Sequence, residues 1–276
     1  MTAPPPDLFA GTAHYYARFR PGYPDAFFEH LVARFGLDGT GTLLDLGCGT
    51  GQLALPLAAH VAGVIGMDPE PEMLAEAAAA ADRAGVRNAR WLRGGDRDLD
   101  RLRDGRSADA HGGSLGAVRL VTIGRAFHWM DQDATLRSLA RIVEPTGGLV
   151  VVSDTERIWN RPGAWQEAVQ AVIRRWLGPA QRAGSGTRAT PHDPFDAILA
   201  RSPFARVETY ELTYRREATV EEIVGYLYST SYCSRAVLGD RREPFEADLR
   251  RTLRQLDPAG VFAEEAELGA WLAWRS

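Results

Sequence analysis

The chain has 276 residues and a formal net charge of −4, and all 32 of its basic residues are arginine. This charge leaves no basic face, which argues against a nucleic-acid partner, and no apolar run reaches membrane-spanning length. The two cysteines exclude a disulfide framework, as expected in a reducing cytoplasm, and no His or Cys cluster has metal-ligand spacing. The length predicts one domain over residues 1–276 that exceeds a minimal α/β unit. The sequence does not indicate whether the protein forms oligomers.

The N-terminal 40 residues precede the first predicted strand. Residues 1–7 contain three successive prolines and have no apolar signal-peptide core, so we predict a disordered tail. Residues 8–40 are predicted to form a helical arm. This arm carries the segment Tyr16-Ala17-Arg18-Phe19-Arg20-Pro21-Gly22-Tyr23-Pro24.

A glycine-rich turn follows the apolar strand 43–46, which contains Asp45. Glycine recurs there at every second position, at Gly47, Gly49 and Gly51. Glycines allow backbone conformations closed to other residues, so an adenosine can lie against main-chain amides at the start of the next helix. The dinucleotide fingerprint needs glycine at Gln52, so the turn indicates an adenosine-bearing cofactor other than NAD. A tight turn without a ligand is the alternative.

Asp68 ends the next predicted strand, 61–67, after a predicted helix over 52–60. It lies about twenty residues beyond the glycines, where a carboxylate can accept hydrogen bonds from both ribose hydroxyls. An alanine-rich helix over 72–84 follows and ends at Gly85. The sequence therefore predicts a cofactor site shared by the first two strands.

The third and fourth strands are predicted over 89–92 and 118–123, joined by a polar surface connection over 100–116. In a doubly wound sheet ordered 3-2-1-4-5, the winding reverses between strands one and four and leaves a crevice above their carboxyl ends. Residues 124–129 should therefore face the glycine turn. His128 in this loop is a side-chain type that titrates near neutrality. It is a candidate base, a candidate group that positions the substrate, or a structural histidine packed on Trp129.

The second half of the chain adds helices to this unit. Strand 148–153 ends before Asp154, which is a candidate polar group at the crevice rim or a cap of the next segment. A helix over 165–176 ends at Gly178. Residues 180–194 have linker composition and are a candidate lid. A short helix to Arg201, a strand over 206–215, an amphipathic helix over 245–256 and a strand over 261–274 follow.

Tyrosines gather on a helix that a capping box predicts to start at Thr219. Tyr228 and Tyr232 are four residues apart and share a face of that helix, where their rings could sandwich a flat substrate. Tyr226 precedes them, and Cys233 follows on the same predicted helix. Core packing with exposed hydroxyls is the alternative.

The motif of Asp45 and the alternating glycines, with Asp68 in register, resembles that of class I S-adenosylmethionine-dependent methyltransferases. Three further segments resemble the small-molecule branch related to trans-aconitate methyltransferase, also described as methyltransferase type 11. They are Y-x-x-x-R-P-x-Y-P over 16–24, A-F-H-W-M-D over 126–131 and A-W-L-A-W-R over 270–275. None of these motifs specifies a substrate.

The resemblance implies a Rossmann-like α/β fold with strand order 3-2-1-4-5-7-6, an antiparallel last strand, and a helical substrate cap over 155–204 and 216–258. Tyr16 and Arg20 would close over the methionine end of the cofactor. Asp96 would accept a hydrogen bond from the adenine amino group, with Asp98 as its rival. The implied cofactor-binding residues are Tyr16, Arg20, Asp45, Gly47, Cys48, Gly49, Gly51, Asp68, Pro69, Asp96, Arg97 and Gly124.

The predicted activity is transfer of a methyl group from S-adenosylmethionine to an oxygen or nitrogen of a small molecule. Trp129, Tyr226, Tyr228 and Tyr232 are the candidate substrate-binding residues, and His128 is the candidate catalytic one. The arginine-rich composition and the resemblance suggest specialised metabolism in a GC-rich bacterium. Two alternatives stay open: a reaction without methyl transfer, such as a cyclisation, and a protein that only senses the cofactor or a metabolite.

Overall fold

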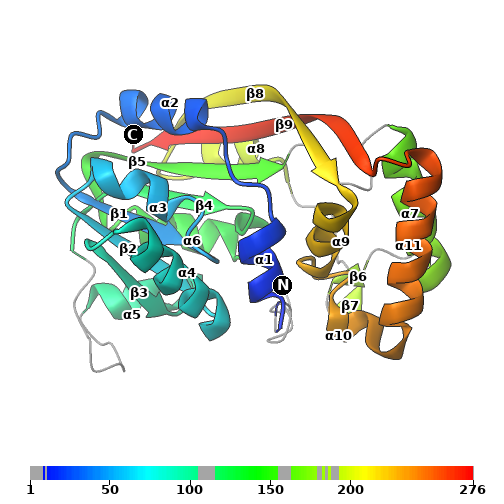
Figure 1. The fold of residues 1–276 in the computed structure, drawn as a ribbon. Helices are drawn as coiled ribbons and strands as arrows, with labels where there is room; N and C mark the ends of the chain where they lie inside the picture. The colour runs from blue at the N-terminus through cyan, green and yellow to red at the C-terminus, as the bar shows by residue number, and fades with distance from the viewer. Residues whose placement is uncertain are drawn as a thin grey trace.

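A computed structural model of the protein describes Phe9 and residues 11–104, 116–154, 163–178, 182–183, 186–187 and 193–275. The predicted N-terminal tail, most of the 100–116 connection and most of the candidate lid over 180–194 lie outside these residues. The described chain forms a twisted sheet with helices on both faces and a separate group of helices at one end (Figure 1).

The central sheet has seven strands in the order β3-β2-β1-β4-β5-β9-β8, which confirms the predicted topology. Strands β1 to β5 are parallel, and β9 is antiparallel to both β5 and β8. The strands are β1 (Thr42–Leu46), β2 (Gly63–Asp68), β3 (Ala89–Arg93), β4 (Val118–Gly124), β5 (Val143–Asp154), β8 (Arg206–Thr219) and β9 (Val261–Trp274). A two-stranded hairpin of β6 (Arg182–Ala183) and β7 (Gly186–Thr187) was not predicted.

Both faces of the sheet are buried, because successive residues of a strand point to opposite faces. Leu43 packs with helices α2 (Asp25–Phe35) and α3 (Ala54–Leu57) on one face. Leu44 joins the core of the other face. The helices of this second face are α5 (Leu99–Arg103), α6 (Gln132–Leu139) and α8 (Phe195–Ala200), and α4 (Pro71–Ala84) packs on β2 and β3.

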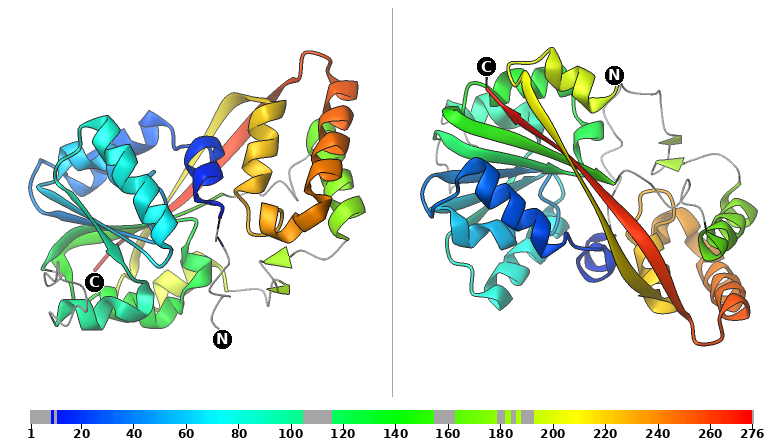
Figure 2. Two further views of the ribbon diagram at one scale, coloured as in Figure 1. Left: turned by 60° about the horizontal axis from the view of Figure 1, so that its bottom comes forward. Right: turned by 90° about the horizontal axis from the view of Figure 1, so that it is seen from above.

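The antiparallel ribbon of β8 and β9 is longer than the rest of the sheet. Each strand has 14 residues, but β5 pairs with β9 only over residues 268–274. The remainder of the ribbon extends past the sheet and carries the cap helices (Figure 2). We use this name for α7 (Ala164–Leu177), α9 (Val220–Tyr228), α10 (Arg235–Leu238) and α11 (Arg242–Leu256), which share an apolar core with the end of the ribbon.

Two expectations about the cap segments were wrong. Helix α8, within the predicted cap segment 155–204, instead packs on the sheet, where Ile198 and Leu199 are buried. Helix α9 starts after Thr219 with the predicted capping box but ends at Tyr228. The hydroxyls of Ser229 and Thr230 donate to the carbonyls of Tyr226 and Leu227, at 2.5 and 2.6 Å.

Such local side-chain bonds compete with a continuing helix. Tyr232 and Cys233 therefore lie in a turn, and the single tyrosine face expected over 228–232 does not form. The predicted helix over 52–60 is also shorter, because it consists of α3 and the 3-10 turn η1 (Ala58–His60).

Gly66 in β2 makes room for the ring of Trp91 on β3. A Cβ atom at this position would lie 2.3 Å from two ring carbons of Trp91 and 3.1 Å from the sulfur of Cys48. We expect Gly66→Ala to lower the free energy of unfolding by about 1–3 kcal/mol, because overpacking displaces the ring. Gly63→Ala on the same strand is the control, since its Cβ would meet only the Asn88 carbonyl oxygen at 3.9 Å. Urea unfolding midpoints compare the two variants, and equal midpoints would contradict the prediction.

Candidate functional site

The glycine turn after β1 is held by its own amides. The N–H groups of Gly47 and Cys48 both donate to the carbonyl oxygen of Met67, at 2.7 and 3.0 Å. Gly51 donates to the Cys48 carbonyl at 2.9 Å, and Gly49 donates to Asp68 Oδ2 at 2.9 Å. These amides therefore fix the turn against β2, which corrects the expectation that they face a ligand. The turn requires glycine at two positions, with φ of 71° at Gly47 and 52° at Gly49.

Asp68 lies beside this turn at the end of β2, and only 9% of the residue is exposed. Its Oδ1 accepts from the Glu70 N–H at 2.9 Å, and its Oδ2 accepts from Gly49. Burial raises the pKa of Asp68, although both N–H bonds oppose that shift. A carboxylate has about four acceptor positions, so each oxygen keeps one for a ribose hydroxyl. This geometry fits the sugar of an adenosine cofactor.

Asp45 occupies a different place from the one expected. Its side chain is buried under the turn, and the residue is 1% exposed. Thr122 on β4 donates its hydroxyl to Asp45 Oδ1 at 2.8 Å. Burial raises the pKa of Asp45 to about 7, opposed by the Thr122 hydroxyl and the Ala54 N–H. Asp45 therefore supports the turn from below, and the predicted direct contact with the cofactor is not available to it in this structure.

The loop after β3 separates the roles of Asp96 and Asp98. Asp98 Oδ2 accepts from the Gly95 N–H at 2.9 Å, and Asp98 Oδ1 pairs with Arg101 at 3.1 Å. Asp98 thus stabilises its own loop. Asp96 Oδ2 accepts the Asp131 N–H at 3.2 Å, which joins this loop to the one after β4. Asp96 is the better candidate for an adenine contact, and its neighbour Arg97 is exposed.

The loop after β4 touches the glycine turn. A Cβ atom added at Gly47 would lie 2.6 Å from the Ala126 side chain and 3.4 Å from that of Met130. The two loops predicted to face each other at the switch point therefore do so. His128 and Trp129 lie in the 3-10 turn η3 (Phe127–Trp129), half-buried, with their ring centroids 4.6 Å apart.

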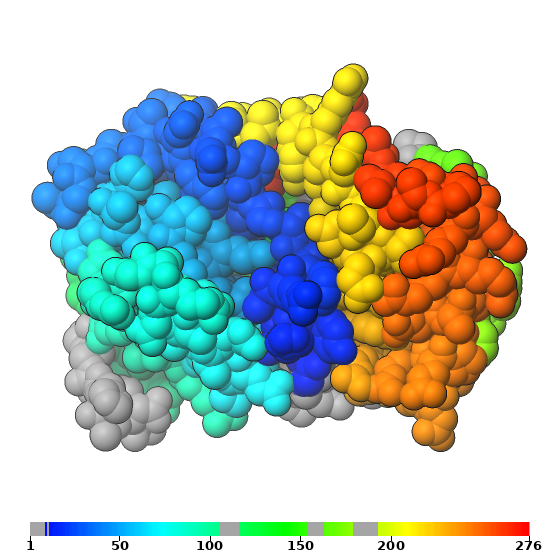
Figure 3. Space-filling view, in the orientation of Figure 1, coloured from blue at the N-terminus to red at the C-terminus, as the bar shows by residue number. Residues whose placement is uncertain are grey.

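Helix α1 (Ala13–Phe19) and the residues after it fill the seam between the sheet and the cap helices (Figure 3). The Arg20 guanidinium lies 5.0 Å from the ring centres of both Tyr16 and Tyr226. Its carbonyl oxygen accepts from Gln52 Nε2 at 3.0 Å. A Cβ at Gly49 would contact the Tyr16 ring at 3.8 Å. The arm is thus fastened to the glycine turn and to the cap, as a cover over the cofactor position would be.

Arg125 is a site residue that sequence reasoning missed. It follows Gly124 at the end of β4 and has a φ of +57°, a conformation that is uncommon outside glycine and often found at functional sites. Its guanidinium donates to the Pro21 carbonyl at 3.1 Å and to Gln52 Oε1 at 3.3 Å, and it lies 4.6 Å from the Tyr23 ring centre. Residue type alone gave no signal for this backbone conformation.

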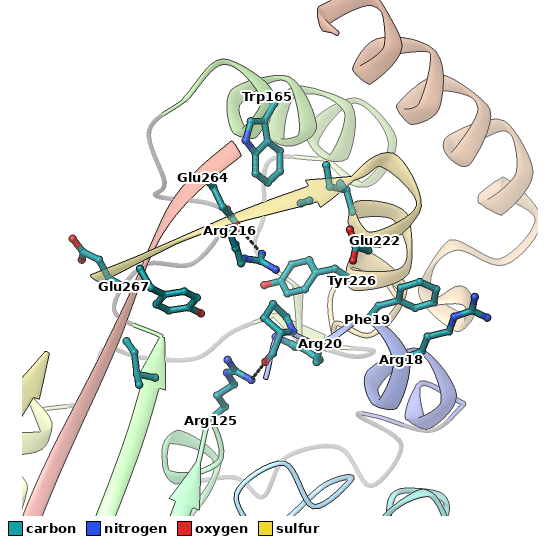
Figure 4. A pocket seen from close by; sticks show the side chains of 15 residues that line it. Arg18, Phe19, Arg20, Arg125, Trp165, Arg216, Glu222, Tyr226, Glu264 and Glu267 are labelled. Atoms are coloured by element: carbon teal, nitrogen blue, oxygen red, sulfur yellow. Dashed lines mark hydrogen bonds and ion pairs between the residues drawn. The ribbon is translucent and has the colours of Figure 1, made fainter. Parts of the chain in front are cut away.

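A cavity of about 130 Å³ lies where the arm, the β4 loop, the ribbon of β8 and β9 and the cap helices meet (Figure 4). Arg20, Arg125 and Arg216 line it, together with Tyr214 and other residues. The same wall includes Trp165, Tyr226 and Glu264. The cavity therefore combines cationic groups, aromatic rings and carboxylates from four parts of the fold.

The predicted tyrosine sandwich is not part of this cavity. Tyr226 lines it, whereas Tyr228 is 4% exposed and donates its hydroxyl to Glu246 Oε2 at 2.7 Å. Burial raises the pKa of Tyr228 and of Tyr232. Tyr228 belongs to the core of the cap, which corrects its assignment to the substrate. Tyr232 lies in the turn after α9 and is half-buried.

Among the described residues, no group of three or more His, Cys, Asp and Glu side chains is arranged to hold a metal ion. None of their helices is long and apolar enough to cross a lipid bilayer.

Comparison with known proteins places this arrangement in a family. A model of the methyltransferase domain matches residues 43–147, which include the glycine turn and the loop after β4. An uncharacterized methyltransferase of Mycobacterium tuberculosis is 26% identical over 82% of this chain and 77% of its own length. The trans-aconitate 2-methyltransferase of an Azoarcus species is 28% identical over 67% of this chain and 66% of its own.

Solved structures agree on the fold. A S-adenosylmethionine-dependent methyltransferase from Geobacter sulfurreducens, in complex with S-adenosyl-L-homocysteine, superposes with a TM-score of 0.53 over the whole of both chains at 14% identity. The sheet order, the buried carboxylate beside a glycine turn and the sequence matches lead to the same family. The chain is a class I S-adenosylmethionine-dependent methyltransferase.

Proposed function

We propose that the enzyme methylates an oxygen or nitrogen atom of a small molecule that binds in the 130 Å³ cavity. The observation that carries the proposal is the position of this cavity. Arg125 lines it and directly follows Gly124 at the carboxyl end of β4, in the loop that touches the glycine turn. A nucleophile in the cavity would thus be near the methyl donor. One relative is named for trans-aconitate, also a small molecule.

The residues around the turn suit S-adenosylmethionine. We assign the ribose hydroxyls to Asp68, the adenine amino group to Asp96 and the methionine end to Tyr16 and Arg20, with Gly49 giving close approach. Gly51 instead makes room for Trp91 and Leu55. When bound, the cofactor supplies a methyl group on a sulfonium, whose transfer is intrinsically favourable. The protein's contribution is then mainly to orient the acceptor and exclude water, which the arm and cap achieve together.

His128 lies in the same loop as Arg125, which lines the cavity, and Ala126, which touches the glycine turn, and it is the proposed catalytic residue. Its ring would take the proton from an attacking hydroxyl or amine, or orient the acceptor by a hydrogen bond. Trp129, whose ring lies against His128 and within 6.3 Å of the Phe9 ring centre, would border the acceptor. Tyr226 would contact the acceptor from the cap.

We expect His128→Gln to lower kcat about 100-fold, a typical effect of losing a general base, with the affinity for S-adenosylhomocysteine unchanged. If His128 is a base, the variant should lose the acidic limb of the pH–rate profile. If His128 only positions the acceptor, the rate should fall and the profile should be retained. His60→Gln, at the end of the 3-10 turn after α3, is the control. Turnover and pH profile equal to wild type would eliminate both roles.

A labelled-methyl assay with a panel of small hydroxylated, amino and carboxylic acceptors tests the activity itself. Calorimetry with S-adenosylhomocysteine first measures whether the cofactor site is functional. Binding without label transfer to any acceptor would support a sensor, and product formation without label transfer would support a reaction such as a cyclisation. We propose a specialised metabolite as the natural acceptor, which acceptor screening against cell extracts would identify.

A further inference from the structure

The wall of the cavity contains a buried ion pair that the motif-bearing segments do not include. Arg216 on β8 lies directly opposite Glu264 on β9 in the strand register, and the two side chains form an ion pair. The Glu264 side chain is 1% exposed, whereas that of Arg216 is 28% exposed. The carboxylate is therefore enclosed in the protein, and the guanidinium retains an accessible surface.

An ion pair with an enclosed carboxylate is unusual in the wall of a cavity. Removing two charges from water is costly, and apolar residues of similar volume often stabilise a fold as well or better. The neighbours of Glu264 on the same face of β9, Phe262 and Ala266, are apolar and buried. Stability alone is therefore a weak reason for the pair, and its place in the cavity wall suits a role in binding.

The geometry gives the guanidinium spare donors toward the cavity. A guanidinium carries five N–H donors and a carboxylate takes at most two of them in a parallel pair. Arg216 lines the cavity and lies between Glu264 and Tyr226 (Figure 4). Glu264 fixes the guanidinium from behind, so that its remaining donors need no reorganisation to meet a ligand.

The rest of the lining reinforces a preference for anions. Arg125 lines the same cavity, as does Arg20, which we assign to the methionine end of the cofactor. Among the carboxylates of the wall, Glu222 Oε2 accepts both the N–H and the hydroxyl of Thr219, each at 2.8 Å, as part of the α9 capping box. The Glu264 carboxylate faces Arg216. Glu222 and Glu264 thus already have donors within the protein, and Glu267 is the third carboxylate of the lining.

We propose that Arg216, held by Glu264, binds an anionic group of the methyl acceptor, which makes the acceptor a small organic anion. This inference rests on the proposed function, since it concerns the acceptor of the same site. A cavity of about 150 Å³ holds one benzene molecule, so 130 Å³ suits an anion of about one ring or a short chain. Carboxylate, sulfonate and phosphate share this chemistry, and the test separates them.

The test measures binding of benzoate, succinate, benzenesulfonate and phenyl phosphate to the full chain saturated with S-adenosylhomocysteine, by ligand-observed NMR. Benzamide and succinamide are the neutral counterparts. We expect at least one anion to bind about tenfold more tightly than its neutral counterpart or than benzamide, as a hydrogen-bonded charge does. If none of the anions binds saturably to the wild type, the inference is overturned.

Variants of the ion pair test whether Arg216 causes the tighter binding of anions. Arg216→Gln alone would leave a buried charge on Glu264, so the key variant is the double replacement Arg216→Leu with Glu264→Leu, which removes the pair together. We expect it to weaken anion binding about tenfold or more and to change amide binding less than about threefold. Unchanged anion binding in this variant overturns the inference.

A matched control exists one residue away. Arg215 lies opposite Glu265 in the same ribbon, with 90% of its side chain exposed, and pairs with Glu265 at 3.7 Å. Arg215→Leu with Glu265→Leu should leave anion binding unchanged. Calorimetry with S-adenosylhomocysteine separates the proposed function from the proposed anion site. If the wild type does not bind this cofactor product, the proposed function is refuted. Equal cofactor affinity in the Arg216 double variant shows that only the acceptor site changed.

Discussion

Replacing Asp68 with alanine is expected to weaken binding of S-adenosylhomocysteine about 100-fold or more. Two hydrogen bonds to a charged carboxylate, each contributing about 1.5 kcal/mol or more, would be lost at the ribose. The variant also removes the acceptor of the Gly49 and Glu70 N–H groups, so the turn itself loosens. Calorimetric titration measures the dissociation constant, and thermal unfolding reports the cost to the fold.

A double-mutant cycle separates the ribose contact from the loosened turn. Asp68→Asn keeps the side-chain volume, and the 2′-deoxy analogue of S-adenosylhomocysteine removes one partner hydroxyl. If the carboxylate binds this hydroxyl, the two changes are strongly non-additive. Asp98→Asn, which alters a carboxylate engaged with Gly95 and Arg101, should change the affinity little. Additive effects of Asp68→Asn and the deoxy analogue would place the ribose elsewhere.

Asp45→Asn is expected to gain stability relative to wild type as the pH rises from 4 to 8. Burial raises the pKa of Asp45 in the folded protein to about 7, compared with about 3.9 in an unfolded chain. The folded state therefore binds the proton more tightly, and its stability falls as the pH rises between these values. The difference approaches an upper bound of about 4 kcal/mol, at 1.36 kcal/mol for each pKa unit.

The measurement is the free energy of unfolding in urea of both proteins at each pH. Because asparagine does not titrate, the difference should grow up to about pH 7 and stay constant above it. Asp82→Asn is the control, since 77% of that side chain is exposed, and its difference from wild type should not vary in this way. A difference between Asp45→Asn and wild type that is independent of pH would show that Asp45 is ionised throughout.

The nucleotide-binding half of the fold was predictable because its signals are local. Glycine spacing, a carboxylate about twenty residues later and alternating strands and helices define β1, β2 and their turn. The full sheet order was implied by the resemblance to class I methyltransferases. The last strand over 261–274 has the bounds that its sequence predicted. The capping box at Thr219 also formed as expected.

The acceptor side was less predictable because it depends on tertiary contacts. The end of α9 at Tyr228 is decided by the hydroxyls of Ser229 and Thr230, and these residue types also occur inside helices. The αL conformation of Arg125 and the burial of Glu264 result from packing between segments far apart in the sequence. Asp45 could not be distinguished from a ligand-binding carboxylate by its motif, since burial alone sets its role.

The ribbon of β8 and β9 joins the cap helices to the sheet, and the family model that matches this chain ends at residue 147, before the ribbon begins. The cap helices therefore lie outside the segment that carries the amides of the glycine turn and the carboxylate of Asp68, and the arm links the two through Arg20. Evolution could exchange the acceptor of such an enzyme by rebuilding a peripheral module while inheriting the methyl-donor site intact. Chimeras that graft a foreign cap onto this ribbon would use this separation between the cap helices and the methyl-donor site.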